Sequence, residues 1–165
     1  MRILLIITFF ANIAFAFGTV PWLPEQVAVH FGIDGVPTRF APPMESAVMM
    51  SVNVFIMGAL FFGVSLLMPI IPSKYINLPN NRDYWLNEEN RPKTMRRICS
   101  SIELIGVITM FFMLLAQWET FRANQMVPPK LAESNVWFGT GVQLVCVAIV
   151  IVRLLLAFRL PKEKD

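Results

Sequence analysis

Long apolar segments alternate with shorter polar ones along the chain. Residues 3–20 are uncharged, and this length is at the short end of what can cross a bilayer. Residues 46–71 also carry no charge and form the strongest candidate span. Residues 98–118 and 136–158 follow, each interrupted by one charged side chain. The pattern predicts four transmembrane helices in a single membrane domain over residues 1–165.

The segment 23–43, between the first two spans, has a different periodicity. Apolar side chains occupy alternate positions in its first half: Val27, Val29 and Phe31. This alternation indicates a β-strand. Asp34-Gly35 favours a tight turn, because both residues tolerate positive φ. We therefore expect residues 36–40 to return beside the first strand, with His30 on the face opposite the three apolar side chains.

The composition is that of a membrane protein. Of the 165 residues, 56% are hydrophobic, and the mean hydropathy is +0.59, too high for a soluble domain of this size. Basic residues are not interleaved with aromatic ones, so no nucleic-acid partner is predicted. The fold class predicted is an all-α membrane protein with four transmembrane helices and a small extracytoplasmic β-ribbon between helices one and two.

The distribution of lysine and arginine predicts the orientation. Eleven of the 14 basic residues lie at the N-terminus, in the polar loop 73–97 or near the C-terminus. The other three are Arg39, Arg122 and Lys130. Because cytoplasmic loops carry the excess of basic residues, both termini and the loop 73–97 are expected in the cytoplasm and the ribbon outside.

Several residues of the ribbon segment form a signature seen elsewhere. They are Leu23-Pro24, Val27, Val29-His30, Gly35, Pro37 and Phe40. This signature resembles that of the bacterial domain-of-unknown-function family 1648, which also forms the N-terminal part of immunity proteins against the sporulation-delaying toxin. The resemblance covers residues 3–71. It implies a multi-pass protein of the bacterial cytoplasmic (inner) membrane whose outer motif comprises Leu23, Pro24, His30, Asp34, Gly35, Pro37 and Phe40.

Two further features bear on this resemblance. The stretch 76–86 is similar to a cytoplasmic loop of stand-alone relatives, whereas Pro42-Pro43 stand where many members have a lysine. The first apolar segment also has features of a cleavable signal peptide, namely Arg2, an apolar core and Ala14-Phe15-Ala16. Relatives keep this segment as their first helix, which favours a transmembrane helix here.

His30 is the only histidine and the main candidate for chemistry. No catalytic or metal-binding motif is recognisable, and no cofactor or metal is predicted. One hypothesis pairs His30 with an outer carboxylate, Glu25, Asp34 or Glu45, as a general base. The alternative, which we favour, is that His30 forms hydrogen bonds that order the ribbon.

Uncharged polar residues recur inside the predicted spans. Counted from the outer ends, four of them share one level about 10–14 Å deep: Asn12, Asn53, Thr109 and Gln143. The favoured interpretation is a layer of interhelical hydrogen bonds that holds a four-helix bundle together. The functional alternative is the floor of a small cavity that opens towards the ribbon.

Two charges also lie inside the spans. Glu103 and Arg153 are each five residues from the expected cytoplasmic end of their helix, which predicts an interhelical ion pair. The rival hypothesis is that Arg153 extends to the headgroups while Glu103 is protonated or meets Arg96 or Arg97.

Three functions stay open at the level of sequence. The first is a non-enzymatic module at the outer face that binds, senses or neutralises a peptide, lipid or protein partner. The second is a membrane enzyme or proton-coupled carrier that uses His30 or Glu103. The third is an accessory subunit of a membrane complex. The lipid bilayer is the one partner that composition itself predicts, and the oligomeric state is left open.

Overall fold

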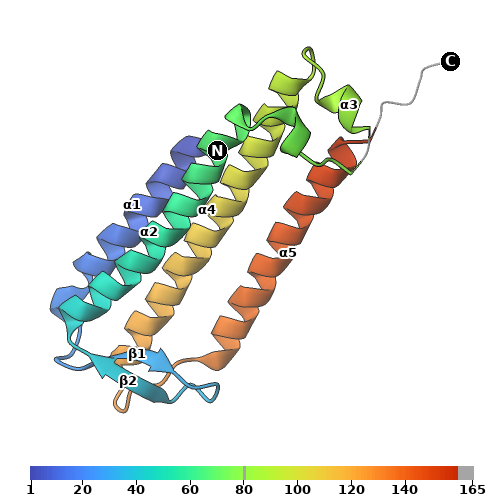
Figure 1. The fold of residues 1–165 in the computed structure, drawn as a ribbon. Coiled ribbons are helices and arrows are strands. Elements are labelled where there is room, and N and C mark those ends of the chain that lie inside the picture. The colour runs from blue at the N-terminus through green and yellow to red at the C-terminus, as the bar shows by residue number, and fades with distance from the viewer. Residues whose placement is uncertain (80, 160–165) are drawn as a thin grey trace.

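A bundle of long helices carries a β-ribbon at one end in the computed structural model, which describes residues 1–79 and 81–159 (Figure 1). The long helices are α1 (Arg2–Gly18), α2 (Pro43–Leu67), α4 (Arg91–Asn124) and α5 (Glu133–Ala157). Within the described residues, these four are long and apolar enough to cross a membrane. The predicted fold class is therefore confirmed.

The ribbon lies between α1 and α2 in the chain, as the alternating pattern predicted. Its strands, β1 (Val27–Phe31) and β2 (Pro37–Ala41), pair antiparallel. The connecting turn closes through a hydrogen bond from the Gly35 N–H to the Gly32 carbonyl at 3.0 Å. Gly35 has φ of +71°, a left-handed conformation that glycine adopts without steric cost. A short 3-10 helix (Val20–Trp22) joins α1 to β1.

The burial of side chains along β1 departs from strict alternation. Ala28 is fully buried beside buried Val27, whereas His30 is exposed. Strict alternation would place Ala28 and His30 on the same face. The pairing with β2 shifts register between Ala28 and His30, and such an irregularity turns side chains out of alternation. The bundle therefore covers two consecutive residues of β1.

Helices α1, α2 and α4 pack against one another, and α5 packs on α4. The shared core of the first three is formed by Leu5, Val54, Val107 and Met110. In Figure 1, α5 stands apart from α1 and α2. Within α5, all of which the structure describes, only Val150 is buried. The fourth helix thus lies on one side of a three-helix core.

The end opposite the ribbon is closed by a folded loop. It contains two 3-10 helices (Met68–Ile70 and Ser73–Tyr75) and the short helix α3 (Arg82–Trp85). Its apolar side chains pack on the ends of α4 and α5 in one cluster: Ile76, Leu86, Met95, Ile98 and Phe158. The Trp85 indole N–H donates to the Phe158 carbonyl at 3.0 Å. This loop is therefore a packed cap.

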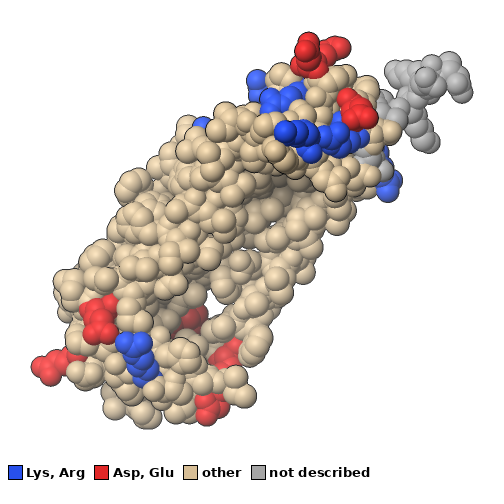
Figure 2. All heavy atoms as spheres, in the orientation of Figure 1, with Lys and Arg blue, Asp and Glu red and all other residues tan. Residues whose placement is uncertain are grey.

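The two ends of the molecule are chemically distinct from its middle. Figure 2 shows the charged side chains at the ends and an uncharged band between them on the visible face. The N-terminus lies at the same end of the molecule as the folded loop, and α5 also ends there (Figure 1). The ribbon and the α4–α5 connection lie at the other end. This is the arrangement of a protein whose middle faces hydrocarbon.

Candidate functional site

The exposed face of the ribbon carries the predicted motif histidine. The Oγ1 of Thr38, on β2, lies 2.7 Å from Nδ1 of His30 and 3.3 Å from its carbonyl oxygen. His30 thus makes its close contacts across the strands. The exposed residues beside it on β2 are Thr38, Arg39 and Phe40. We use the term ribbon face for the exposed side chains of these four residues.

The hypothesis of a His30–carboxylate pair finds no geometric support. The Asp34 carboxylate accepts from the backbone N–H of Val36 at 3.1 Å. Glu45 pairs instead with Arg39 at 3.3 Å, with both side chains at least half exposed. No carboxylate of residues 1–79 or 81–159 lies within salt-bridge distance of His30. A carboxylate therefore does not orient the imidazole for general base catalysis.

The ribbon is joined to the bundle by the side-chain amide of Asn124, the last residue of α4. Oδ1 of Asn124 accepts from the Ala28 N–H at 2.7 Å, and Nδ2 donates to the Ala28 carbonyl at 3.0 Å. The amide thus satisfies both backbone groups of Ala28 as a neighbouring strand would. Asn124 is 5% exposed, so this pair is shielded from water and each bond is expensive to leave unmade.

Two further contacts fix the ends of the ribbon segment. The side chain of Gln125 donates to the Trp22 carbonyl at 2.9 Å, ahead of β1. In the turn, the Gly35 carbonyl accepts from the Leu131 N–H at 3.0 Å. A Cβ at Gly35 would clash with the carbonyl oxygen of Leu131. The α4–α5 connection therefore lies directly against the turn, and glycine is required there for two independent reasons.

The other motif residues shape the segment. Leu23 is half-buried after the 3-10 helix, and Pro24 is exposed. Pro37 begins β2 opposite Phe31. The side chain of Phe40 is 47% exposed. With Asp34 and Gly35 in the turn, the motif residues are brought into one ribbon, but they do not converge on a pocket.

The predicted polar layer is only partly formed. Asn12 is fully buried, and its Nδ2 donates to the Met110 carbonyl at 2.9 Å. Its partner on α4 is Gln117, whose Nε2 donates to Asn12 Oδ1 at 2.8 Å. Asn53 is exposed and bonds to Met49 of its own helix at 2.9 Å. The expectation that Asn53 joins this layer is wrong, because its side chain faces outward from α2.

Thr109 and Gln143 also take no part in the predicted polar layer. Both are partly exposed, and within the described chain neither side chain makes an interhelical hydrogen bond. Gln143 lines a groove between α4 and α5 instead. The fourth helix contributes nothing to the layer because it packs on α4 and stands apart from α1 and α2 (Figure 1).

The space between ribbon and bundle is almost completely filled. The cavity there measures about 10 Å³ and is lined by residues that include Leu23, Val27 and Gln117. This is about the volume needed for one water molecule. A ligand cavity opening towards the ribbon, with the polar layer as its floor, is therefore absent from the described structure.

Glu103 joins three helices at the level where α1 begins. Its Oε1 accepts from Nε of Arg2 at 2.9 Å and from the Ser65 hydroxyl at 2.7 Å. The guanidinium of Arg2 also reaches Ser65 at 3.3 Å. The Glu103 side chain is 8% exposed and that of Arg2 is 51% exposed. Because a buried carboxylate is costly without a partner, this cluster fixes the start of α1 to α2 and α4.

The expected ion pair between Glu103 and Arg153 is wrong. Arg2 and Ser65 occupy the carboxylate, and Arg153 is exposed on α5. The rival hypothesis named Arg96 and Arg97, but Arg97 donates to the Ala157 carbonyl at 2.9 Å. The prediction failed because Glu103 faces α1 and α2, where Arg2 and Ser65 bind it, whereas Arg153 is exposed on α5.

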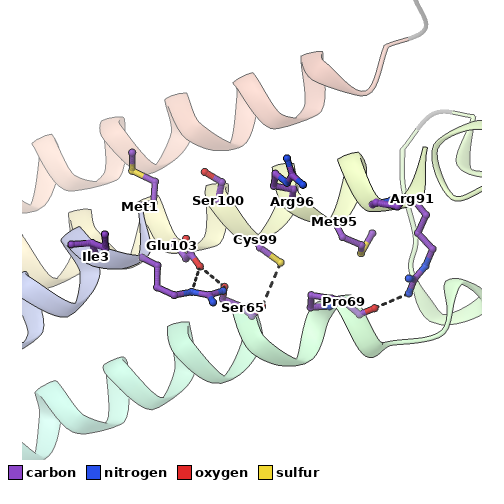
Figure 3. A pocket seen from close by; sticks show the side chains of 12 residues that line it. Met1, Ile3, Ser65, Pro69, Arg91, Met95, Arg96, Cys99, Ser100 and Glu103 are labelled. Atoms are coloured by element: carbon purple, nitrogen blue, oxygen red, sulfur yellow. Dashed lines mark hydrogen bonds and ion pairs between the residues drawn. The ribbon is translucent and has the colours of Figure 1, made fainter. Parts of the chain in front are cut away.

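A pocket of about 780 Å³ opens beside this cluster (Figure 3). Cys99 and Ser100 lie on its α4 wall, with the thiol of Cys99 3.4 Å from the Ser65 carbonyl. Arg91, at its edge, donates to the carbonyls of Pro69 and Ile71 at 2.9 and 2.8 Å. Several polar groups at this pocket, those of Arg2, Ser65, Arg91 and Glu103, are thus bound to other groups of the protein, which is typical of a structural junction.

The buried contacts of α4 follow one stripe. Glu103, Met110, Gln117 and Asn124 recur every seventh residue and are all buried. Glu103 binds Arg2 and Ser65. The Met110 carbonyl and the Gln117 side chain both bind the Asn12 amide. Asn124 binds the Ala28 backbone. A seven-residue spacing keeps side chains on one helix face. The stripe therefore connects the start of α1 to the ribbon.

Sequence analysis missed Gln117 and Asn124 because the third span was ended at residue 118. Gln117 then counted as the edge of the span and Asn124 as part of a loop. Their spacing of seven residues from Glu103 onward was the available signal, because it continues the buried face beyond the apolar segment.

The fold and these contacts define a multi-pass membrane protein in which a helical bundle holds a small ribbon at one end. The model of the protein family described as "Domain of unknown function (DUF1648)" matches residues 3–55, which comprise α1, the ribbon and the first half of α2. This match confirms the resemblance to that family over residues 3–55, a shorter stretch than the residues 3–71 expected from the motif. No curated protein and no solved structure gives a significant match.

Proposed function

We propose that this protein is a non-enzymatic binding module whose recognition surface is the ribbon face: His30, Thr38, Arg39 and Phe40. The observation that supports it most is the way the ribbon is held. Asn124, Gln125 and Leu131 each bond to the backbone of the ribbon segment or the residue before it, so the bundle holds the ribbon through its backbone and leaves its outer side chains exposed. A surface held in one conformation loses less entropy on binding, which favours recognition of a partner.

We infer that the ribbon faces away from the cytoplasm in a bacterial inner membrane. The folded loop, the start of α4 and the two terminal regions carry eleven basic residues, against three at the ribbon end. This asymmetry supports cytoplasmic termini. A peptide or protein at the outer face is then the proposed partner, in keeping with the family resemblance to immunity proteins. The ribbon face suits such a partner, because it offers one aromatic ring, one guanidinium and hydrogen-bonding groups.

The alternative of an enzyme or proton-coupled carrier has less support. His30 contacts Thr38 and no carboxylate of the described chain, and Glu103 is neutralised by Arg2. An accessory subunit of a larger complex remains the second candidate, because α5 leaves most of its surface exposed. The two candidates differ in where a partner would contact the chain, at the ribbon or along α5.

Site-specific photocrosslinking in native membranes separates them. A crosslinking residue at Thr38 should give a discrete adduct, and one at exposed Asn77, on the opposite end, should not. The same probe at exposed Ile149 of α5 reports on a subunit interface. The adduct at Thr38 should disappear when Gly35→Val distorts the turn. Adducts confined to Ile149 would favour the accessory subunit, and adducts confined to Asn77 would overturn both proposals.

A further inference from the structure

A groove of about 630 Å³ runs between α5 and the wall formed by α1 and α4. Figure 2 shows the molecule hollowed between α5 and the rest of the bundle. Most of its lining is apolar: Phe111, Phe112, Leu115, Phe138 and Val142. Along α4 the lining extends from Val107 to Glu119, a rise of about 18 Å. This is close to the depth of one leaflet, about half of the 30 Å hydrocarbon core.

The end of the groove near the ribbon is polar and charged. Glu119 and Asn135 both line it there. Oε1 of Glu119 accepts from Nη1 of Arg122 and from Nδ2 of Asn135, each at 3.3 Å. The Glu119 side chain is 17% exposed and that of Arg122 is 48% exposed. The groove therefore combines an apolar channel of leaflet depth with an adjacent negative and positive charge at its mouth.

We propose that this groove binds one zwitterionic aminophospholipid, with an acyl chain between α4 and α5. Its ammonium lies at the Glu119 carboxylate and its phosphate at the Arg122 guanidinium. Each protein charge is opposite in sign to the lipid group placed beside it, and both protein charges lie at the headgroup end of the channel. The volume falls within the 300–1,000 Å³ typical of small-molecule pockets. A groove that opens sideways within the apolar band is in direct contact with lipid, so the ligand needs no aqueous path.

A helix from a partner or a second copy is the alternative occupant of this groove. A single acyl chain is the slimmer occupant and fits without separating α5 from α4.

Two glycines of α5 supply a matched test. A Cβ at Gly139 would lie 3.6 Å from the Phe112 ring, so a larger side chain there would extend along the groove wall. A Cβ at Gly141 meets nothing within 4 Å.

The full-length protein and the variants Gly139→Trp and Gly141→Trp are incorporated into vesicles that contain equal amounts of phosphatidylethanolamine and phosphatidylglycerol. Each is then extracted in mild detergent, and retained lipid is counted by native mass spectrometry.

The wild type and Gly141→Trp should each retain one phospholipid, enriched in phosphatidylethanolamine. Gly139→Trp should lower lipid retention about tenfold or more, which corresponds to about 1.4 kcal/mol or more of binding free energy. Val142→Trp, on the same wall, replaces it if Gly139→Trp does not give a monodisperse helical protein. Glu119→Gln should keep the lipid but lose the preference for phosphatidylethanolamine.

Three results would overturn the proposal. The first is a wild type that retains no phospholipid. The second is equal retention by Gly139→Trp and Gly141→Trp. The third is a wild-type dimer that Gly139→Trp converts to a monomer, which would assign the groove to a second copy of the chain. An unchanged lipid preference in Glu119→Gln would overturn the headgroup assignment.

Discussion

The amide of Asn124 pairs with both backbone groups of Ala28, at 2.7 and 3.0 Å, and so joins the end of α4 to the ribbon as a strand would. Because the pair is buried, the ribbon is part of the fold and not an appended loop. The stripe of buried residues on α4 that ends at Asn124 begins at Glu103. One face of one helix therefore organises both ends of the molecule.

Removal of the Asn124 amide should destabilise the protein. Asn124→Ala leaves the N–H and carbonyl of Ala28 without their partner, at about 1–3 kcal/mol for each buried group. We expect a loss of about 2–6 kcal/mol in the free energy of unfolding, measured by denaturant titration in mixed micelles. Asn53→Ala is the control, because Asn53 is exposed and bonds only its own helix. Equal effects of the two substitutions would contradict the anchoring role.

Gly35 should not tolerate a side chain. Gly35→Ala forces a left-handed residue to carry a Cβ, which costs about 1–2 kcal/mol, and places that Cβ against the Leu131 carbonyl. The melting temperature in detergent should fall. Gly63→Ala is the matched control, because its Cβ would meet nothing within 4 Å. A melting temperature unchanged in Gly35→Ala would mean that the turn is not held against the α4–α5 connection.

Glu103 should be energetically coupled to Arg2 and not to Arg153. In a double-mutant cycle, Arg2→Gln and Glu103→Gln should show a coupling energy of about 0.5–2 kcal/mol. The cycle of Glu103→Gln with Arg153→Gln should be additive, because Arg153 is exposed on α5. Unfolding free energies in micelles supply both cycles. Coupling to Arg153 in place of Arg2 would reinstate the pairing that the sequence alone suggested.

The buried amides of Asn12 and Gln117 should behave as a pair. Asn12→Leu leaves Nε2 of Gln117 without its acceptor, and Gln117→Leu leaves Oδ1 of Asn12 without its donor, so each alone should cost about 1–3 kcal/mol. The double substitution replaces both polar groups by apolar ones of similar size and should be closer to the wild type than the sum of the single losses. Oε1 of Gln117 is the one buried side-chain oxygen or nitrogen without a partner among the described residues, which favours this outcome.

The inferred orientation predicts reporter activities. A reporter active only outside the cytoplasm should work when fused after Lys130 and be silent after Asn90. The basis is the excess of basic residues on the side of the folded loop. The reverse pattern would move the ribbon face into the cytoplasm and remove the proposed outer-face function.

Apolar segments and the ribbon were predictable because each is a local pattern. The spans follow from length and hydropathy, and the turn follows from Asp34-Gly35. The partners of Glu103 and Asn12 were not predictable in this way. They depend on where α4 begins and ends, and the helix continues through polar residues on both sides of its apolar segment. Packing against the folded loop and the ribbon supplies the stability that hydropathy does not report.

The position of α5 was the other feature beyond the reach of sequence. Its composition matches that of the other spans, so nothing in it distinguishes a core helix from one that packs mainly on α4. That placement left Gln143 out of the polar layer and Arg153 out of reach of Glu103. The seven-residue spacing on α4 was present in the sequence, but the predicted span ended at residue 118 and so did not extend to Asn124.

Hydrogen exchange at the backbone amide of Ala28, in nanodiscs, tests most directly whether the ribbon is a fixed surface. The wild-type amide should be protected to the level of the outer turns of α4, and Asn124→Ala should speed its exchange by about tenfold or more. Asn53→Ala should leave it unchanged. Wild-type exchange as fast as that of an unstructured peptide would contradict the account, because the ribbon would then not be held by the bundle.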